Sequence, residues 1–128
     1  MKILLKLEDL AKLVLAYAGT LYLGFEWWLF FALLLAPDLG MLGYLFGSKA
    51  GAWVYNLFHH QGVAIVVGLV GLYLGDTYLQ FAGLLLFGHS AMDRALGYGL
   101  KYNDHFKHTH LGWIGPQSKQ GYYKPREL

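Results

Sequence analysis

The sequence contains no cysteine and few charged residues. The absence of cysteine excludes disulfides, thiolate metal sites and a cysteine nucleophile. Only 14% of the 128 residues are charged, whereas a soluble domain carries about 25%. Charged residues are absent between Lys49 and Asp76, and again between Asp76 and Asp93. Because about 20 apolar residues span a bilayer, these uncharged stretches indicate an integral membrane protein.

Several functional signatures are also missing. The net charge of +2 gives no reason to expect nucleic acid as a partner. The chain has no serine nucleophile motif, phosphate-binding loop or dinucleotide-binding fingerprint. The expected partner is membrane lipid. Small-residue faces at Gly43/Gly47 and Gly68/Gly71 leave open a second copy of the chain, that is, a homo-oligomer.

What the chain does contain is a series of four long apolar segments. The apolar run near the N-terminus resembles a signal peptide, but Glu8 and Asp9 interrupt that pattern, so we expect a first membrane helix instead. We predict an all-α polytopic membrane protein with a single domain over residues 1–128. Its four transmembrane helices cover about residues 10–25, 27–46, 52–74 and 77–96, and residues 97–128 form a polar and aromatic C-terminal segment.

Basic residues set the predicted orientation. They cluster near the N-terminus, in the second loop and after the fourth helix, whereas the first and third loops carry only Glu26 and Asp76. By the positive-inside rule, both termini and the second loop lie in the cytoplasm. We therefore expect a protein of the cytoplasmic (inner) membrane with both termini on the cytoplasmic side.

Ionisable residues inside the apolar segments are the strongest functional signal, because a charge in lipid costs a few kcal/mol unless it is paired. Asp38, His59 and His89 each lie seven or eight residues from the predicted cytoplasmic end of a helix. At 1.5 Å per residue, each is about 10–12 Å below the membrane surface. Asp93 follows His89 by four residues and shares its helix face. The spacing predicts that Asp38, His59 and His89 from three helices meet at one depth, with Asp93 about one turn nearer the cytoplasm.

Local sequence refines this picture. His59 and His60 are adjacent, so only one imidazole can point fully inward, and we favour His59. Pro37 removes a backbone donor and kinks its helix, which leaves carbonyl groups free beside Asp38. The alternative is a purely structural role, in which this segment is a kinked packing helix and Asp38 pairs with a histidine.

The C-terminal segment offers further candidates. His110 is a potential ligand if this segment folds back over the cytoplasmic opening, and a solvated interfacial role is the alternative. For His105 and His108 we favour the interfacial role. Arg94 and Lys101 suit the phosphate of a lipid headgroup. The predicted substrate-binding residues are Arg94, Lys101, Asn56, Tyr55 and Tyr98.

The nitrogen and oxygen donors predict the metal class. Such a mixed set suits Zn, Fe or Mn better than Ca or Mg. A bound ion of this kind activates water and polarises a carbonyl or phosphoryl oxygen. A spare carboxylate, Asp93 or Asp38, would be the catalytic general base. The predicted metal ligands are His59, His89, Asp93, Asp38 and His110.

These residues belong to a longer pattern. It comprises Pro37-Asp38, Gly43-Tyr44, Tyr55-Asn56-x-x-His59, His89-x-x-x-Asp93-Arg94, Gly97-Tyr98-Gly99-Leu100-Lys101-Tyr102 and Thr109-His110-Leu111-Gly112. The pattern resembles a family of small integral membrane proteins catalogued as domain of unknown function 4260. The resemblance covers roughly residues 27–112 and implies a compact membrane protein. It supplies no activity, and His60, His105 and His108 fall outside it.

Three functions remain open on this evidence. The leading hypothesis is a metal-dependent membrane enzyme, hydrolase-like, that acts on a lipid or lipophilic substrate near the cytoplasmic leaflet. The second is a non-catalytic membrane subunit or small transporter with a buried polar or proton-carrying network. The third is a haem-binding electron carrier with His59 and His89 as axial ligands. The nearby carboxylates argue against haem, whose pocket in lipid should be apolar.

Overall fold

The computed structural model describes residues 1–115, which are mostly helical. The elements in order are helices α1 (Lys2–Tyr22) and α2 (Leu29–Leu33), the 3-10 helix η1 (Ala36–Phe46), helices α3 (Ser48–His59), α4 (Gln61–Leu74) and α5 (Thr77–Leu96), and strands β1 (His108–Thr109) and β2 (Gly112–Trp113). The two strands pair antiparallel in a short hairpin. The predicted helical class is confirmed apart from this hairpin. The predicted C-terminal segment extends to residue 128, and its last thirteen residues, 116–128, lie outside the described residues.

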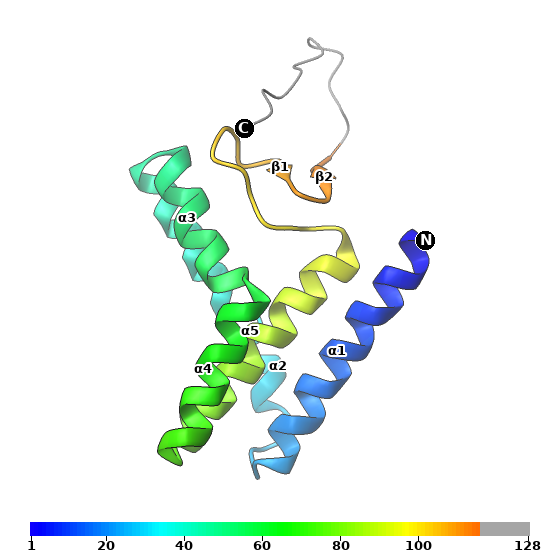
Figure 1. The fold of residues 1–128 in the computed structure, drawn as a ribbon, viewed down its shortest axis with the longest axis vertical. Helices are drawn as coiled ribbons and strands as arrows, with labels where there is room; N and C mark the ends of the chain where they lie inside the picture. The colour runs from blue at the N-terminus through cyan, green and yellow to red at the C-terminus, as the bar shows by residue number, and fades with distance from the viewer. Residues whose placement is uncertain (116–128) are drawn as a thin grey trace.

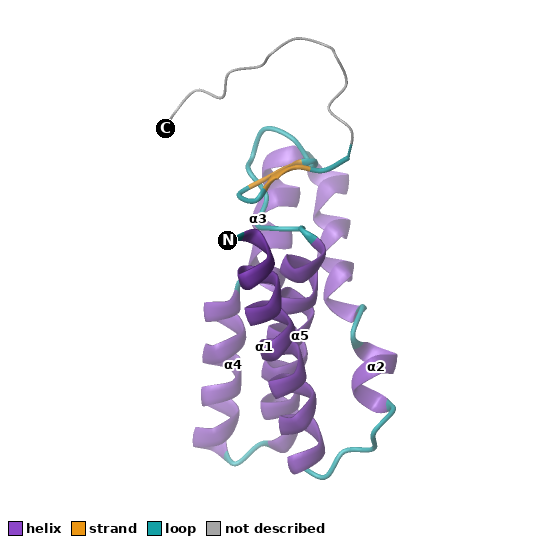
Figure 2. Ribbon diagram, turned by 90° about the vertical axis from the view of Figure 1, so that its right-hand side faces the viewer, coloured by secondary structure: helices purple, strands orange, loops and turns teal. Residues whose placement is uncertain are grey.

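Helix α5 is the central element of the fold. It packs along α4 and along α1, while η1 packs against α3 as a helical hairpin. Figures 1 and 2 show α1, α4 and α5 side by side, with α3 and the β-hairpin towards the end of the molecule where the chain begins. The polar residues of α5, η1 and α3 are therefore brought to the junction between the helical hairpin and the three-helix bundle.

The start of α5 is fixed by a glycine and a capping aspartate. Gly75 ends α4 in the left-handed conformation (φ 65°), which residues with a side chain adopt only at a cost. The carboxylate of Asp76 then accepts hydrogen bonds from the backbone amides of Tyr78 and Leu79, which otherwise lack partners in the first turn of a helix. This tight turn lets α4 and α5 pack along each other directly.

The first and fourth predicted helices correspond to α1 and α5, the second is divided between α2 and the 3-10 helix η1, and the third is also interrupted. It breaks at His60, whose backbone is extended, and α3 and α4 meet at 51°. Within the described chain, only the helical segment Leu29–Phe46 is long and apolar enough to cross a membrane. If the bent pair α3–α4 is counted as one span, the number of candidate spans rises to two. The prediction of four transmembrane helices is therefore not confirmed. The charges of α1 and the polar residues of α5 reduce the apolar character of those two helices.

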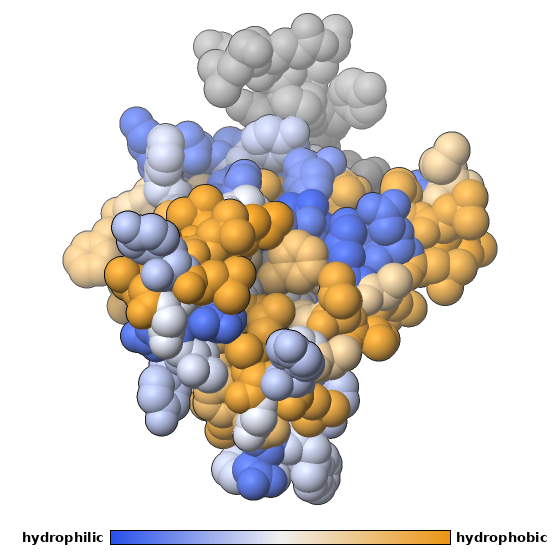
Figure 3. Space-filling model, turned by 60° about the horizontal axis from the view of Figure 1, so that its bottom comes forward, coloured by the Kyte–Doolittle hydropathy of each residue, from blue (hydrophilic) through white to orange (hydrophobic). Residues whose placement is uncertain are grey.

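The buried core is small and the exposed surface is strongly apolar. Phe30 is fully buried against Ala16, Phe81 and Leu85. Large apolar side chains are exposed along α1, η1, α3 and α4, for example Phe46 at 84%, whereas on the central helix α5 they are exposed only near its ends. Figure 3 shows apolar side chains gathered over much of one face. Monomeric soluble proteins rarely expose such extended apolar patches, which mark surfaces that contact lipid or other proteins.

Candidate metal centre

Four side chains from three elements converge at the junction of the bundle and the helical hairpin. Asp38 comes from η1, His59 from the last residue of α3, and His89 and Asp93 from α5. One ligand atom from each lies within 4.8 Å of the others. Both histidines are almost completely buried, whereas Asp38 keeps 31% of its side chain exposed. In residues 1–115 this is the only group of histidines and carboxylates arranged to hold a metal ion.

The individual distances match those between ligands of one ion. His89 Nε2 lies 3.1 Å from Asp38 Oδ1 and 3.4 Å from Asp93 Oδ2. The corresponding distances from His59 Nε2 are 3.3 and 3.4 Å, and the two Nε2 atoms are 2.9 Å apart. Atoms bound at about 2.0–2.1 Å to a tetrahedral zinc are about 3.3 Å from each other. The donor set is thus close to the spacing that a single transition metal ion requires.

Backbone carbonyls fix the orientation and tautomer of both imidazoles. His59 Nδ1 donates to the Tyr55 carbonyl at 2.8 Å, and His89 Nδ1 donates to the Leu34 carbonyl at 2.6 Å. A carbonyl oxygen can only accept, so Nδ1 carries the proton in each ring. In the neutral imidazoles both Nε2 atoms therefore present lone pairs to the site. Metal-binding histidines are usually anchored by such a contact at the other ring nitrogen.

The Leu34 carbonyl is available because the helical hydrogen bonding changes at Pro37. In a continuous α-helix the amide of Asp38 would bond to Leu34, but here it bonds to the Leu35 carbonyl at 3.1 Å. Pro37 lies at the start of η1 and has no amide hydrogen of its own. The expectation that this proline frees a carbonyl near Asp38 is met, and the freed group positions His89 across the helix interface.

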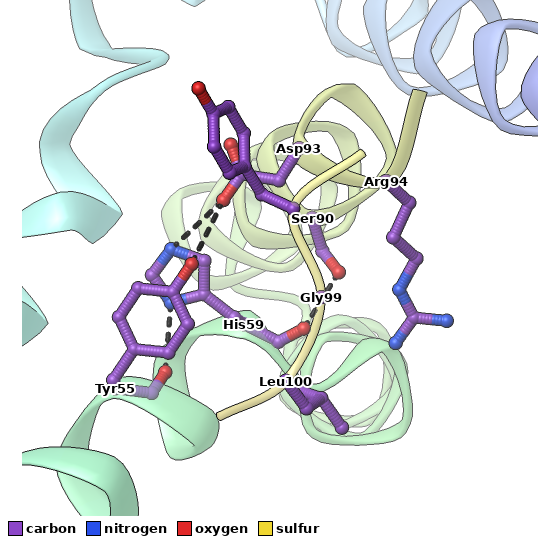
Figure 4. Close-up of a pocket in the computed structure, with 8 residues that line it drawn as sticks. Tyr55, His59, Ser90, Asp93, Arg94, Gly99 and Leu100 are labelled. Carbon is purple, nitrogen blue, oxygen red and sulfur yellow. Dashed lines mark hydrogen bonds and ion pairs between the residues drawn. The ribbon is translucent and has the colours of Figure 1, made fainter. Parts of the chain in front are cut away.

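Tyr55 and Ser90 support the two ligands from behind. The Tyr55 ring stacks on the His59 ring at 3.7 Å, and its hydroxyl donates to Asp93 Oδ2 at 3.2 Å. The Ser90 hydroxyl donates to the His59 carbonyl at 2.6 Å. This hydrogen bond gives a partner to the last carbonyl of α3, where the helix breaks. Figure 4 shows these contacts around His59. The sequence interpretation missed Ser90, because a serine in an apolar helix usually bonds to its own helix.

A narrow pocket joins the centre to the surface. Two of the four ligands, His59 and Asp93, lie at its inner end, and it is too tight for a water molecule in this conformation. Its lining is His59, Asp93, Tyr55, Ser90, Arg94, Tyr98, Gly99 and Leu100. Access to the centre through this pocket therefore requires movement of the segment 98–100.

Asn56 ties that segment to α3. Its side-chain oxygen accepts from the Lys101 amide at 2.7 Å, and its Nδ2 donates to the Lys101 carbonyl at 2.8 Å. The Lys101 side chain is buried, donates to the Phe106 carbonyl at 2.8 Å and lies 4.6 Å from the Tyr55 ring centroid. Burial lowers the pKa of the Lys101 ammonium, and the Asp93 and Asp38 carboxylates oppose that shift. Asn56 and Lys101 thus hold the C-terminal segment over the site and lie outside the pocket lining.

The remaining predicted residues lie apart from the four ligands. His110 does not join them: its ring is exposed, and its Nδ1 accepts from the Leu100 amide at 2.7 Å. His60 accepts from the Val63 amide at the start of α4, and His108 pairs with Asp104 at 2.8 Å. The prediction that His110 is a ligand depended on the path of the C-terminal loop. That path is set by contacts between residues distant in sequence. Arg94, Tyr98 and Tyr55 line the pocket, and their predicted contact with a substrate stays a prediction.

One comparison with known proteins gives a match. The family model described as Domain of unknown function (DUF4260) matches residues 2–114, almost the whole described chain. No curated protein and no solved structure matches significantly. The match agrees with the resemblance that the sequence pattern indicated.

Proposed function

The chain belongs to the DUF4260 family, whose description assigns no activity, and we propose that it is a metal-dependent membrane enzyme. Its centre is formed by Asp38, His59, His89 and Asp93. One observation carries the proposal: both imidazoles are anchored through Nδ1, so that both Nε2 lone pairs face two carboxylates. The two Nε2 atoms and Asp38 Oδ1 face one another with no donor between them, and the adjacent Asp93 Oδ2 accepts from the Tyr55 hydroxyl. These acceptor groups repel one another, and a cation relieves that repulsion.

The donor set suits Zn, Fe or Mn. When bound, such an ion polarises a carbonyl or phosphoryl oxygen and lowers the pKa of a bound water, which is the chemistry of a hydrolase. Asp93 is held by the Tyr55 hydroxyl and serves as a fixed ligand. Asp38 is the most exposed of the four groups and is the better placed to take a proton from water during hydrolysis.

The substrate we propose is a lipid or another lipophilic molecule in the cytoplasmic leaflet. The exposed apolar side chains of the helices favour a position in a membrane, for which we propose the inner membrane. The distribution of basic residues favours cytoplasmic termini. A substrate that diffuses laterally in the bilayer would reach a site between membrane-facing helices once segment 98–100 moves aside.

Metal analysis of the purified protein is the decisive experiment. We expect about one Zn, Fe or Mn ion per chain, with loss of most of it in His59→Ala and His89→Ala. His60→Ala is the matched control, because its side chain is exposed and only caps α4. Asp38→Asn tests the site without opening a cavity in the core. Absence of metal from the wild type after reconstitution with all three ions would exclude the proposal.

A second candidate is a proton-handling network without metal. The Nε2 atoms of His59 and His89 are 2.9 Å apart, which is a hydrogen-bond distance for one shared proton. Metal-free protein with unchanged thermal stability favours this alternative. The haem hypothesis fits poorly. Axial nitrogens on opposite sides of an iron are about 4 Å apart for bonds of about 2 Å, whereas the Nε2 atoms of His59 and His89 are 2.9 Å apart.

A further inference from the structure

The outer part of the pocket differs chemically from its inner end. The inner end presents acceptors, namely the two ligands His59 and Asp93. The rest of the lining includes two residues with donors: Arg94, whose guanidinium extends away from His59 and Asp93 (Figure 4), and Gly99, through its backbone amide. A ligand bound in the outer part therefore needs acceptor atoms that are directed at the donors of Arg94 and Gly99.

Arg94 has no acidic partner in the described chain. Within residues 1–115 its guanidinium makes no ion pair and no side-chain hydrogen bond, although Asp93 is the preceding residue. Asp93 is instead directed at the two histidines and accepts from Tyr55. A guanidinium beside a functional pocket, with all its donors available, is suited to planar bidentate contact with a phosphate or carboxylate.

The Gly99 amide adds a second donor. Gly99 is buried, and its amide hydrogen has no acceptor among residues 1–115. A side chain here would collide with the His110 ring, at 2.5 Å from its Nδ1. Buried backbone donors are nearly always satisfied, so an amide without an acceptor among residues 1–115, in the same pocket as Arg94, is a second, independent indication of an anionic ligand.

We infer that Arg94, with the Gly99 amide, forms an anion subsite that binds the phosphate or carboxylate group of the substrate beside the metal centre. The inference rests on the proposed function for its place in a reaction, but anion binding does not require the metal. Segment 98–100 is the wall that moves to admit the ligand, because it is a loop between α5 and the hairpin, whereas the other walls are helical. The substrate class is therefore an anionic amphiphile rather than a neutral ester.

Calorimetric titration of the full chain in a neutral detergent tests this inference. The probes are dihexanoyl phosphatidate, inorganic phosphate and, as a neutral ligand, dihexanoylglycerol. We expect phosphatidate binding to weaken about tenfold or more in Arg94→Gln, and less in Arg94→Lys, which keeps the charge but loses the fork. Lys49→Gln is the matched control, because it removes one exposed positive charge away from the pocket.

The outcomes separate the ligand sources and the two proposals. Tight binding of phosphatidate alone identifies a lipid headgroup, whereas equal binding of inorganic phosphate identifies a free anion, and both support the subsite. Equal binding of the neutral lipid, or equal losses in the Arg94 and Lys49 variants, overturns it. Metal content is measured on the same samples: metal-free protein with Arg94-dependent binding refutes the metal centre alone, and metal-loaded protein without such binding refutes the subsite alone.

Discussion

At the scale of single residues, His89 is positioned by a carbonyl that belongs to another element. The Leu34 carbonyl is left without its α-helical partner and accepts from His89 Nδ1. Sequence alone indicated that Pro37 would free a carbonyl nearby, because proline always removes one backbone donor. It did not indicate which imidazole would use that carbonyl, since the pairing joins residues 55 positions apart.

Ser90→Ala tests the support of His59. The hydroxyl donates to the buried His59 carbonyl, and its loss leaves that carbonyl unsatisfied. We expect a loss of about 1–3 kcal/mol in the free energy of unfolding, together with weaker metal binding. Thermal melting in detergent measures the first effect, and titration with a chelator measures the second.

Ser48→Ala is the control for that substitution. Ser48 makes a similar hydrogen bond to the Asn103 carbonyl, but the contact is exposed. Its removal should change stability by no more than about 0.5 kcal/mol. Equal effects of the two substitutions would show that the Ser90 contact has no special role.

At the scale of elements, the four ligand residues were predictable and the bend between α3 and α4 was not. Asp38, His59, His89 and Asp93 are conspicuous because they are ionisable residues in apolar helices. The break at His60 has no proline to signal it. It depends on the His60 side chain, which accepts from the Val63 amide at the start of α4, and on the Ser90 hydroxyl, which donates to the His59 carbonyl at the end of α3. The second contact joins residues 31 positions apart and is not visible in the local sequence.

Gly83 of α5 and Gly68 of α4 face each other where these helices pack, and the contact depends more on Gly83 than on Gly68. A Cβ at Gly83 would lie 2.6 Å from the Gly68 backbone, whereas a Cβ at Gly68 would lie 3.9 Å from Gly83. We expect Gly83→Ala to cost about 1–3 kcal/mol and Gly68→Ala to be neutral or stabilising, because alanine favours helices. Melting temperatures of the two variants in detergent provide the comparison. Similar values for both would contradict this account of the packing.

At the scale of the whole molecule, metal binding should stabilise the folded chain. The ion would join α5 to the helical hairpin of η1 and α3. Apart from the site, α3 and α5 are in contact at few places. A ligand at a hundred times its dissociation constant stabilises by about 2.7 kcal/mol. We expect chelators to lower the melting temperature of the wild type and to leave His89→Ala unchanged. A chelator effect of the same size in both proteins would place the metal elsewhere.

The absence of native cysteine allows a direct test of the proposed orientation. The N-terminus and the β-hairpin lie at one end of the fold, and the ends of α1 and α4 lie at the other (Figure 1). Single cysteines at Lys6 and Lys107 should react with an impermeant maleimide only from the cytoplasmic side. Cysteines at the exposed Tyr22 and Tyr73 should react only from the opposite side. Labelling of all four from one side would exclude a spanning arrangement.

The order of the ligands along the chain governs when the centre can form during synthesis. Asp38 and His59 leave the ribosome first and can pair with each other, but the other two groups arrive only with α5, which carries His89 and Asp93. A nascent chain that ends before α5 therefore offers only half of the donors, too few for a closed transition metal site. Under the proposed function, metal capture would be a late event in biogenesis, and a loaded ion would mark chains whose last helix has packed.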